Sequence, residues 1–147
     1  MHRVAAGGRK GLPVAILLFV AAAAWAFPAP AAPDGESLFA SNCSPCHGAK
    51  AVGEDPQNNV GGGWREDGSM IAPALNGTAH AWHHGPDLLF RYVRDGSVDP
   101  HSPMPAFGDR LTEDEIWSII RYFQSLWPDR TRALYEQNYP GGLGSAH

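Results

Sequence analysis

The sequence predicts an all-α protein of one small domain, and three observations support this fold class. Three segments carry helical spacing or helix-capping residues, and we find no convincing run of alternating apolar and polar residues that would indicate a strand. The length of 147 residues suits one domain. Both cysteines of the chain stand three residues apart in one predicted helix, with a histidine directly behind them: Cys43, Cys46 and His47.

The first predicted helix covers residues 35–47, GESLFASNCSPCH. It follows Asp34, a residue type that caps helix N-termini. Leu38 and Phe39 supply its apolar stripe. Cys43 and Cys46 fall one helical turn apart, so we expect both thiols on one face of this helix.

The second predicted helix covers residues 86–95, PDLLFRYVRD. Pro86 suits the first helical position, and Gly96 suits the position just past the end. Leu88, Leu89 and Tyr92 fall at helical spacing and predict the apolar face.

The third predicted helix begins after Thr112 and has the clearest signals. Thr112 and Glu115 have the spacing of a capping box, and the acidic first turn suits the helix dipole. Pro128 ends the helix. One apolar face follows the spacing i, i+3, i+4, i+7: Ile116, Ile119, Ile120 and Phe123.

The remaining chain is irregular by prediction. Residues 51–70 form a loop rich in Gly, Asp and Asn. After Pro128 we expect a short helix within residues 131–137, and the final GGLGSAH is expected to fray. The predicted organisation is a leader over residues 1–32, a domain over 33–128 and a C-terminal tail over 129–147.

The leader combines basic residues, an apolar run of about 15 residues and small residues that suit a signal peptidase. It predicts a signal peptide, or an uncleaved N-terminal membrane anchor, so the folded part is expected outside the cytoplasm, in the periplasm. Removing Arg3, Arg9 and Lys10 leaves eight basic residues against 15 acidic ones, a net charge of −7. Such an acidic surface excludes nucleic acid as a partner.

The stretch C-x-x-C-H is the attachment pattern of c-type haem. Two thiols three residues apart reach the two vinyl groups from the end of one helix, and the next imidazole points at the iron. Three alternatives fit less well. A redox disulfide of the thioredoxin type needs βαβ patterning, a structural zinc site needs four ligands, and a plain disulfide over so short a loop stabilises little. We therefore expect one covalent haem c, held by Cys43 and Cys46, with His47 as an iron ligand.

At this point the sequence resembles the bacterial class I monohaem cytochromes c. The resemblance covers residues 33–128 and rests on three stretches in the family's order, GESLFASNCSPCHG, APALNG and SPMPAFGDRLTEDEIWSIIRYF. It implies the cytochrome c fold, a small helical bundle around one haem in which the first and last helices cross. Gly35 and Phe39 would then pack against Ile119 and Tyr122.

The second iron ligand is expected to be Met104. Pro103 and Pro105 fix the backbone around it, and the family's ligand methionine occupies this place, commonly as MPAF. The alternatives are Met70, which we expect to pack or be exposed, and the histidines at positions 80, 83, 84 and 101. In the family the proline of APALNG accepts the imidazole hydrogen bond and the following leucine packs on the haem, which implies Pro73 and Leu75 here.

The segment TAHAWHHGPD, residues 78–87, has three interpretations. It can be a plain loop leading into the second helix. Trp82 or a neighbouring histidine can contact a haem propionate. His80, His83 and His84 can bind a second metal ion, since histidine pairs bind copper and zinc.

His/Met ligation leaves iron no open position, so substrate chemistry at the metal is disfavoured and no enzymatic activity is expected. The favoured function is one-electron transfer in an exported respiratory or redox chain, with an oxidase, dehydrogenase or copper protein as partner. The alternative is a haem c subunit of a periplasmic dehydrogenase or oxidase complex, docked through Trp127, Tyr135 and Tyr139. A haem sensor or weak peroxidase requires Met104 to leave the iron. Contact with a membrane is expected only through a retained leader.

Overall fold

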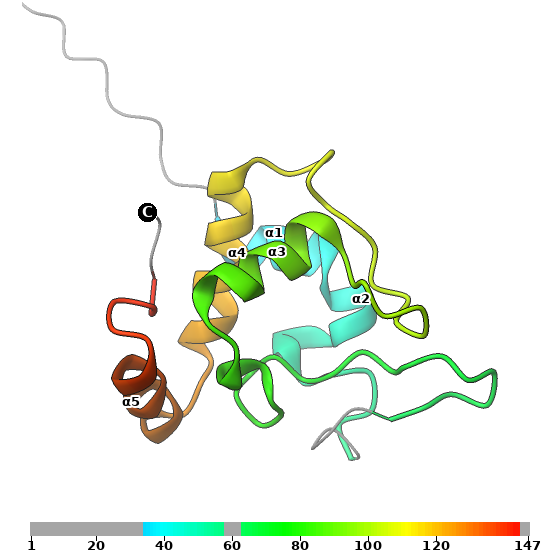
Figure 1. The fold of residues 1–147 in the computed structure, drawn as a ribbon, viewed down its shortest axis with the longest axis horizontal. Coiled ribbons are helices and arrows are strands. Elements are labelled where there is room, and N and C mark those ends of the chain that lie inside the picture. Colours follow the sequence, from blue (N-terminus) through cyan, green and yellow to red (C-terminus); the bar gives the residue numbers. More distant parts are fainter. Residues whose placement is uncertain (1–33, 58–62, 145–147) are drawn as a thin grey trace, which may run out of the picture. The chain divides into compact units, whose positions relative to one another are not determined.

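The computed structural model describes residues 34–57 and 63–144, which belong to one compact unit. The predicted leader, residues 1–32, lies outside the described residues and stays a prediction. The described part is helical, and its only extended pairing is an isolated antiparallel bridge between Trp64 and Met70. Its α-helices are α1 (Gly35–Asn42), α2 (Ser44–His47), α3 (Pro86–Asp95), α4 (Glu113–Ser125) and α5 (Asp129–Asn138). The all-α prediction is confirmed (Figure 1).

The first predicted helix is two separate helices, because the helix is interrupted at Cys43, between α1 and α2. Asp34 caps α1 as expected, its side chain accepting from the Glu36 N–H. Pro45 has no N–H, so a continuous helix would lack one of its bonds here. The chain ends α1 at Asn42 and starts again at Ser44, with the His47 N–H donating to the Cys43 carbonyl at 2.8 Å. The break gives the two cysteines different surroundings.

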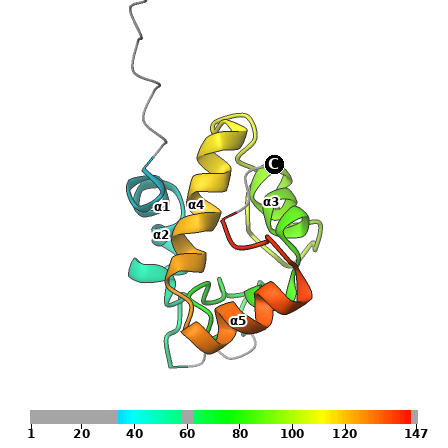
Figure 2. The ribbon, with the colours of Figure 1, turned by 90° about the vertical axis from the view of Figure 1, so that its left-hand side faces the viewer.

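Helices α1 and α4 cross at very close range, as the resemblance implies. A Cβ added at Gly35 would lie 2.1 Å from the Ser118 carbonyl oxygen, so only glycine lets the two backbones approach this far. The Phe39 and Tyr122 rings lie 5.3 Å apart beside the crossing. Figure 2 shows α1 and α3 on either side of α4.

Helix α3 forms over the predicted residues but buries a partly different face. Its buried side chains are Leu89, Phe90 and Val93, whereas Leu88 and Tyr92 are only partly buried. The difference arises because Phe90 stacks on Trp117 of α4, with ring centroids 4.9 Å apart. A large aromatic contact therefore sets the rotation of α3 about its axis.

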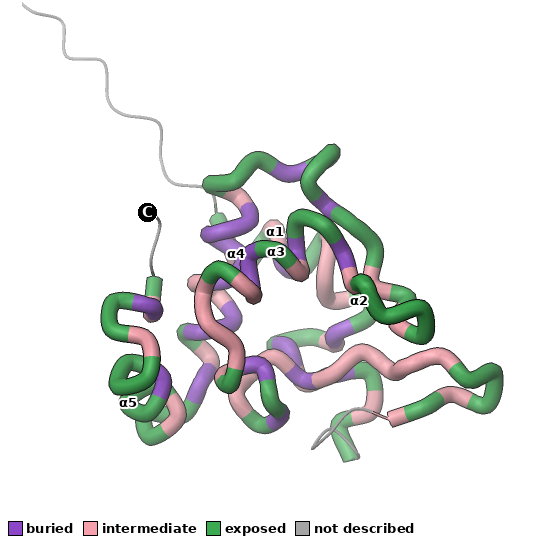
Figure 3. Tube along the Cα trace, in the orientation of Figure 1, coloured by how far each residue is buried: buried purple, intermediate pink, exposed green. Residues whose placement is uncertain are grey.

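Helix α4 is the central element of the core. The predicted capping box is present, with the Thr112 hydroxyl accepting from the Glu115 N–H and the Glu115 carboxylate accepting from the Thr112 N–H. The predicted apolar face is buried, and Figure 3 shows this buried stretch along α4. Four side chains of this face lie in the core: Ile116, Ile119, Ile120 and Phe123, each at most 2% exposed.

The segment after Pro128 is more ordered than the sequence suggests. Helix α5 runs from Asp129 to Asn138, beyond the short helix expected within residues 131–137. The following stretch does not fray over its described part. Gln124 of α4 donates to the Gly142 carbonyl at 3.2 Å and accepts from the Gly144 N–H at 3.1 Å. A side chain of α4 thus holds residues 142–144.

The proposed docking strip in this tail is wrong for two of its three residues. Trp127 is 3% exposed and Tyr135 is fully buried, and their rings contact each other edge to face at 4.9 Å. Tyr139 is partly buried and donates its hydroxyl to the His83 carbonyl at 2.9 Å. Trp127 and Tyr135 therefore extend the core, and Tyr139 packs against it from a partly buried position.

Candidate haem-binding site

Helix α2 and Cys43, the residue directly before it, present both thiols and the imidazole together. Cys43 is partly buried and packs against the hydrophobic core, whereas Cys46 is exposed, and both thiols are free. Burial, and to a lesser extent the neighbouring Cys46, raises the pKa of the Cys43 thiol to about 11. The two sulfurs are therefore available as thiols beside a buried histidine.

The His47 imidazole is held in one orientation. The ring is 8% exposed, and its Nδ1 lies 2.8 Å from the Pro73 carbonyl oxygen. A carbonyl oxygen can only accept, so Nδ1 must carry the proton and Nε2 is left with its lone pair. Burial lowers the pKa of His47 and favours this neutral form, although the Pro73 carbonyl and the Glu54 carboxylate oppose the shift. The structure thus prepares Nε2 to bind a metal ion.

A tight turn behind α2 brings Pro73 to the imidazole. Gly48 and Gly53 have φ of 71° and 88°, and Lys50 and Ala51 also lie in the left-handed region at 55° and 58°. The Gly53 N–H donates to the His47 carbonyl at 2.7 Å. A Cβ at Gly53 would lie 2.8 Å from the Ala74 nitrogen, so the turn presses directly on the segment that follows Pro73.

Leu75 is fixed through its backbone. The Ala51 carbonyl accepts from the Leu75 N–H at 2.8 Å, and the Trp127 indole N–H donates to the Leu75 carbonyl at 2.7 Å. The Leu75 side chain is partly buried and packs against the core. Sequence reasoning did not find these roles of Ala51 and Trp127, because both depend on partners far away in the chain.

Met104 also packs, partly buried, against the same core cluster as Cys43 and Leu75. Its loop is fastened to the end of α3. The Met104 carbonyl accepts from the Ser97 N–H at 3.2 Å, and the Phe107 N–H donates to the Val93 carbonyl at 3.1 Å. The segment lies so close to Gly96 that a Cβ there would be 3.0 Å from the Met104 oxygen. The methionine loop is therefore held at both sides.

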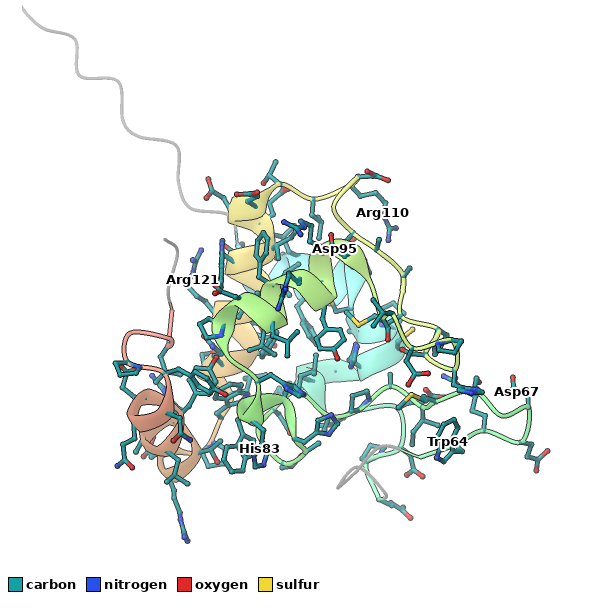
Figure 4. All side chains as sticks on the ribbon, in the orientation of Figure 1. Trp64, Asp67, His83, Asp95, Arg110 and Arg121 are labelled. Atoms are coloured by element: carbon teal, nitrogen blue, oxygen red, sulfur yellow. The ribbon has the colours of Figure 1, made fainter. Side chains whose placement is uncertain are left out.

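Met70 and His101, two of the alternative ligand candidates, contact each other through their backbones. The Met70 N–H donates to the His101 carbonyl at 2.8 Å, and the exposed His101 ring contacts Trp64 edge to face at 5.5 Å. Figure 4 shows Trp64 and Asp67 on the extended loop that carries these contacts. Met70 is partly buried there, in keeping with the packing or exposed role expected for it.

The histidines at 80, 83 and 84 contact aromatic rings. His80 and His84 meet edge to face at 5.5 Å, and His83 lies 3.8 Å from the Trp82 ring centroid. Burial and the two neighbouring histidines lower the pKa of His84. Across residues 34–57 and 63–144, no group of three or more His, Cys, Asp or Glu side chains could hold a metal ion.

The residues present fit a covalently bound haem. Two free thiols and a buried neutral imidazole with a free Nε2 are the donor set that c-type haem attachment needs. Together with the all-helical fold, this arrangement defines a c-type cytochrome domain.

Comparison with known proteins gives the family. Residues 30–123 match the family described as cytochrome c oxidase, cbb3-type, subunit III, and the chain belongs to it. The chain is 28% identical over 109 residues to a thiosulfate dehydrogenase of Psychrobacter arcticus, covering 74% of this chain and 30% of that protein. It is 31% identical over 99 residues to the cbb3-type cytochrome c oxidase subunit FixP of Sinorhizobium medicae, covering 63% and 29%. The chain spans about a third of the length of these relatives. No solved structure matches it.

Family membership establishes the cofactor and the general role. A cytochrome c domain of this family carries covalently bound haem c with its iron, and its role is electron transfer. Among the residues that the structure describes, no helix is long and apolar enough to cross a membrane.

Proposed function

We propose that this protein is an exported one-electron carrier whose haem is attached through Cys43 and Cys46, with His47 and Met104 as axial ligands. The observation that supports it best is the His47 ring, buried behind two free thiols with its Nδ1–H donated to Pro73. The haem supplies reversible exchange of one electron at its iron. The protein's own residues hold the imidazole, offer the thioether and keep water from the core side.

Each proposed residue has a distinct role. Pro73 orients the imidazole through its carbonyl, and Leu75 contributes apolar contact from a backbone held by Ala51 and Trp127. Met104 offers a thioether from a loop fastened to α3, and a thioether ligand favours the ferrous state. With both His47 and Met104 holding the iron, no position would remain for a substrate, so we propose no catalytic activity for this domain.

The attachment test uses the purified holoprotein and acid–acetone extraction. We expect the colour to stay with the polypeptide. Cys46→Ala should lose one thioether bond and most of the accumulated protein. Ser44→Ala is the matched control on α2, because the Ser44 hydroxyl donates to the Ala40 carbonyl of α1 and takes no part in the proposed attachment. Haem that extracts freely from the wild type contradicts the proposal.

The ligand test compares wild type with Met104→Ala. We expect the wild-type ferric spectrum to show the weak long-wavelength band of methionine on iron, and the variant to lose it. The variant should also bind carbon monoxide rapidly in the ferrous state and have a lower midpoint potential. Absence of the band in the wild type would favour a histidine ligand, and rapid carbon monoxide binding by the wild type would favour a sensor or peroxidase.

A second candidate function is a haem subunit of a larger dehydrogenase or oxidase assembly. It is favoured by the names of the two relatives, a thiosulfate dehydrogenase and an oxidase subunit. Its test is haem staining of native complexes from periplasmic and membrane fractions. A free carrier should migrate alone and carry a mature N-terminus near Phe27 or Ala32. Co-migration with a catalytic subunit would favour the second candidate, and an intact Met1 in membranes would indicate a retained anchor.

A further inference from the structure

Glu54 connects the loop after the turn to the segment that carries Pro73. Its backbone N–H donates to the Ala72 carbonyl at 3.0 Å, and its carboxylate accepts from the Ala72 N–H at 3.0 Å. Both polar groups of the Ala72 backbone are therefore bonded to this one residue. The next residue, Pro73, supplies the carbonyl that fixes the His47 ring.

Arg65 completes the arrangement from the extended loop. Its guanidinium pairs with both carboxylate oxygens of Glu54, with Nε donating to Oε1 at 2.9 Å and a second nitrogen bonded to Oε2. The guanidinium also donates to the Met70 carbonyl at 2.6 Å and to the Ser69 hydroxyl at 3.0 Å. The Glu54 and Arg65 side chains keep 33% and 32% of their surface exposed, so solvent screens part of their charge. A bidentate pair of this kind is geometrically specific.

The carboxylate of Glu54 also acts on His47 through its charge. The Ala72 N–H, and then Arg65, hold the pKa of Glu54 below its usual value, so it is ionised at neutral pH. A fixed negative charge on the imidazole side favours the ferric over the ferrous state, and the partial cancellation by Arg65 limits this effect.

We propose that Glu54 and Arg65 are positioning residues that set the redox potential of this cytochrome, Glu54 lowering it and Arg65 raising it. The pair acts on the iron through a continuous path: Arg65 to Glu54, Glu54 to Ala72, and Pro73 to the imidazole. The inference rests on the proposed role of His47 as an iron ligand. On this proposal, the extended loop of residues 63–71 tunes the site through Arg65.

The test is a spectroelectrochemical titration of purified holoprotein variants. Glu54→Gln removes the charge but keeps an acceptor for the Ala72 N–H, so the midpoint potential should rise. Arg65→Gln leaves the carboxylate uncompensated, so the potential should fall. Arg65→Lys keeps the positive charge and should restore most of the wild-type value. Glu66→Gln makes the same charge change one residue from Arg65, on an exposed side chain, and should leave the potential nearly unchanged.

The two opposite shifts separate tuning from simple loosening of the structure. If Glu54→Gln and Arg65→Gln both move the potential in the same direction, or neither moves it beyond Glu66→Gln, the inference is overturned. Amide hydrogen exchange gives a second readout, because Glu54→Ala should accelerate exchange at Ala72 relative to Glu66→Ala. If the wild type shows no reversible one-electron couple on a covalently bound haem, the proposed function itself fails, and that result is distinct from the other two.

Discussion

Gly35→Ala should destabilise the protein although alanine is the better helix former. The added Cβ would lie 2.1 Å from the Ser118 oxygen and 2.7 Å from its carbonyl carbon, both backbone atoms of α4 that no rotamer change can move. Reaching even the shortest tolerated distance of 3.0 Å requires α1 and α4 to separate by about 1 Å. That separation also loosens the Phe39–Tyr122 contact beside the crossing.

The expected cost is about 2 kcal/mol in the free energy of unfolding. Overpacking of this kind costs about 1–3 kcal/mol, and the helix preference of alanine recovers less than about 1 kcal/mol. For a domain of this size we expect the melting temperature to fall by about 10 °C. Urea unfolding of the holoprotein, followed by far-UV circular dichroism, measures the difference.

Ala40→Leu is the matched control for Gly35→Ala. Ala40 is an exposed residue of α1, so the larger side chain enters solvent and the free energy should change by less than about 0.5 kcal/mol. A Gly35→Ala protein as stable as the wild type would refute the close crossing of α1 and α4.

Three further predictions concern single residues around the site and the core. Trp127→Phe keeps an aromatic ring but removes part of a buried side chain and the indole N–H that donates to the Leu75 carbonyl. The free energy of unfolding should therefore fall by at least about 1–3 kcal/mol, and an unchanged urea midpoint would contradict this. Lys50→Gly should raise the melting temperature, because removing the Cβ of an exposed residue at φ 55° stabilises the folded protein by about 1 kcal/mol. Ala49→Gly is the control and should not raise it, because Ala49 lies outside the left-handed region. Tyr135→Phe should change the free energy of unfolding little at neutral pH, since the buried hydroxyl makes no well-formed hydrogen bond within the described residues.

Tyr135→Phe should also remove a loss of stability at alkaline pH. Burial, followed by the neighbouring Tyr139, raises the pKa of Tyr135 to about 12 in the folded protein, whereas the unfolded chain ionises near 10. The stabilising contribution is therefore complete below pH 10 and disappears as the pH rises towards 12. Unfolding free energies measured across this interval should fall more steeply in the wild type, and parallel curves would contradict the burial of this phenol.

The parts of the fold with strong local signals could be predicted from the sequence. The capping box and apolar spacing of residues 112–123 depend only on neighbours in the chain, and α4 follows them closely. The break at Cys43 was missed because Pro45 was not weighed against an otherwise continuous helical pattern. The face of α3 was partly wrong because its rotation depends on Phe90 meeting Trp117, a contact between distant segments.

The candidate site divides in the same way. The spacing of Cys43, Cys46 and His47 indicates haem attachment from the sequence alone. The structure places the Pro73 carbonyl within hydrogen-bond distance of the imidazole, as the resemblance implied. The assignments of these residues and of Met104 and Leu75 as haem contacts remain predictions. Glu54 and Arg65 had no recognisable signal, because their partners lie 11 to 18 residues away across a glycine-rich loop.

The packing of α5 has a consequence for fragments of this protein. The family match ends at residue 123, yet the core continues past it through Trp127 and the fully buried Tyr135. A fragment cut at the edge of the match would lack the indole that holds Leu75, and it would also lack Gln124 together with its backbone partners Gly142 and Gly144. The family match and the folded core therefore end at different residues, and expression trials should retain residues through Gly144.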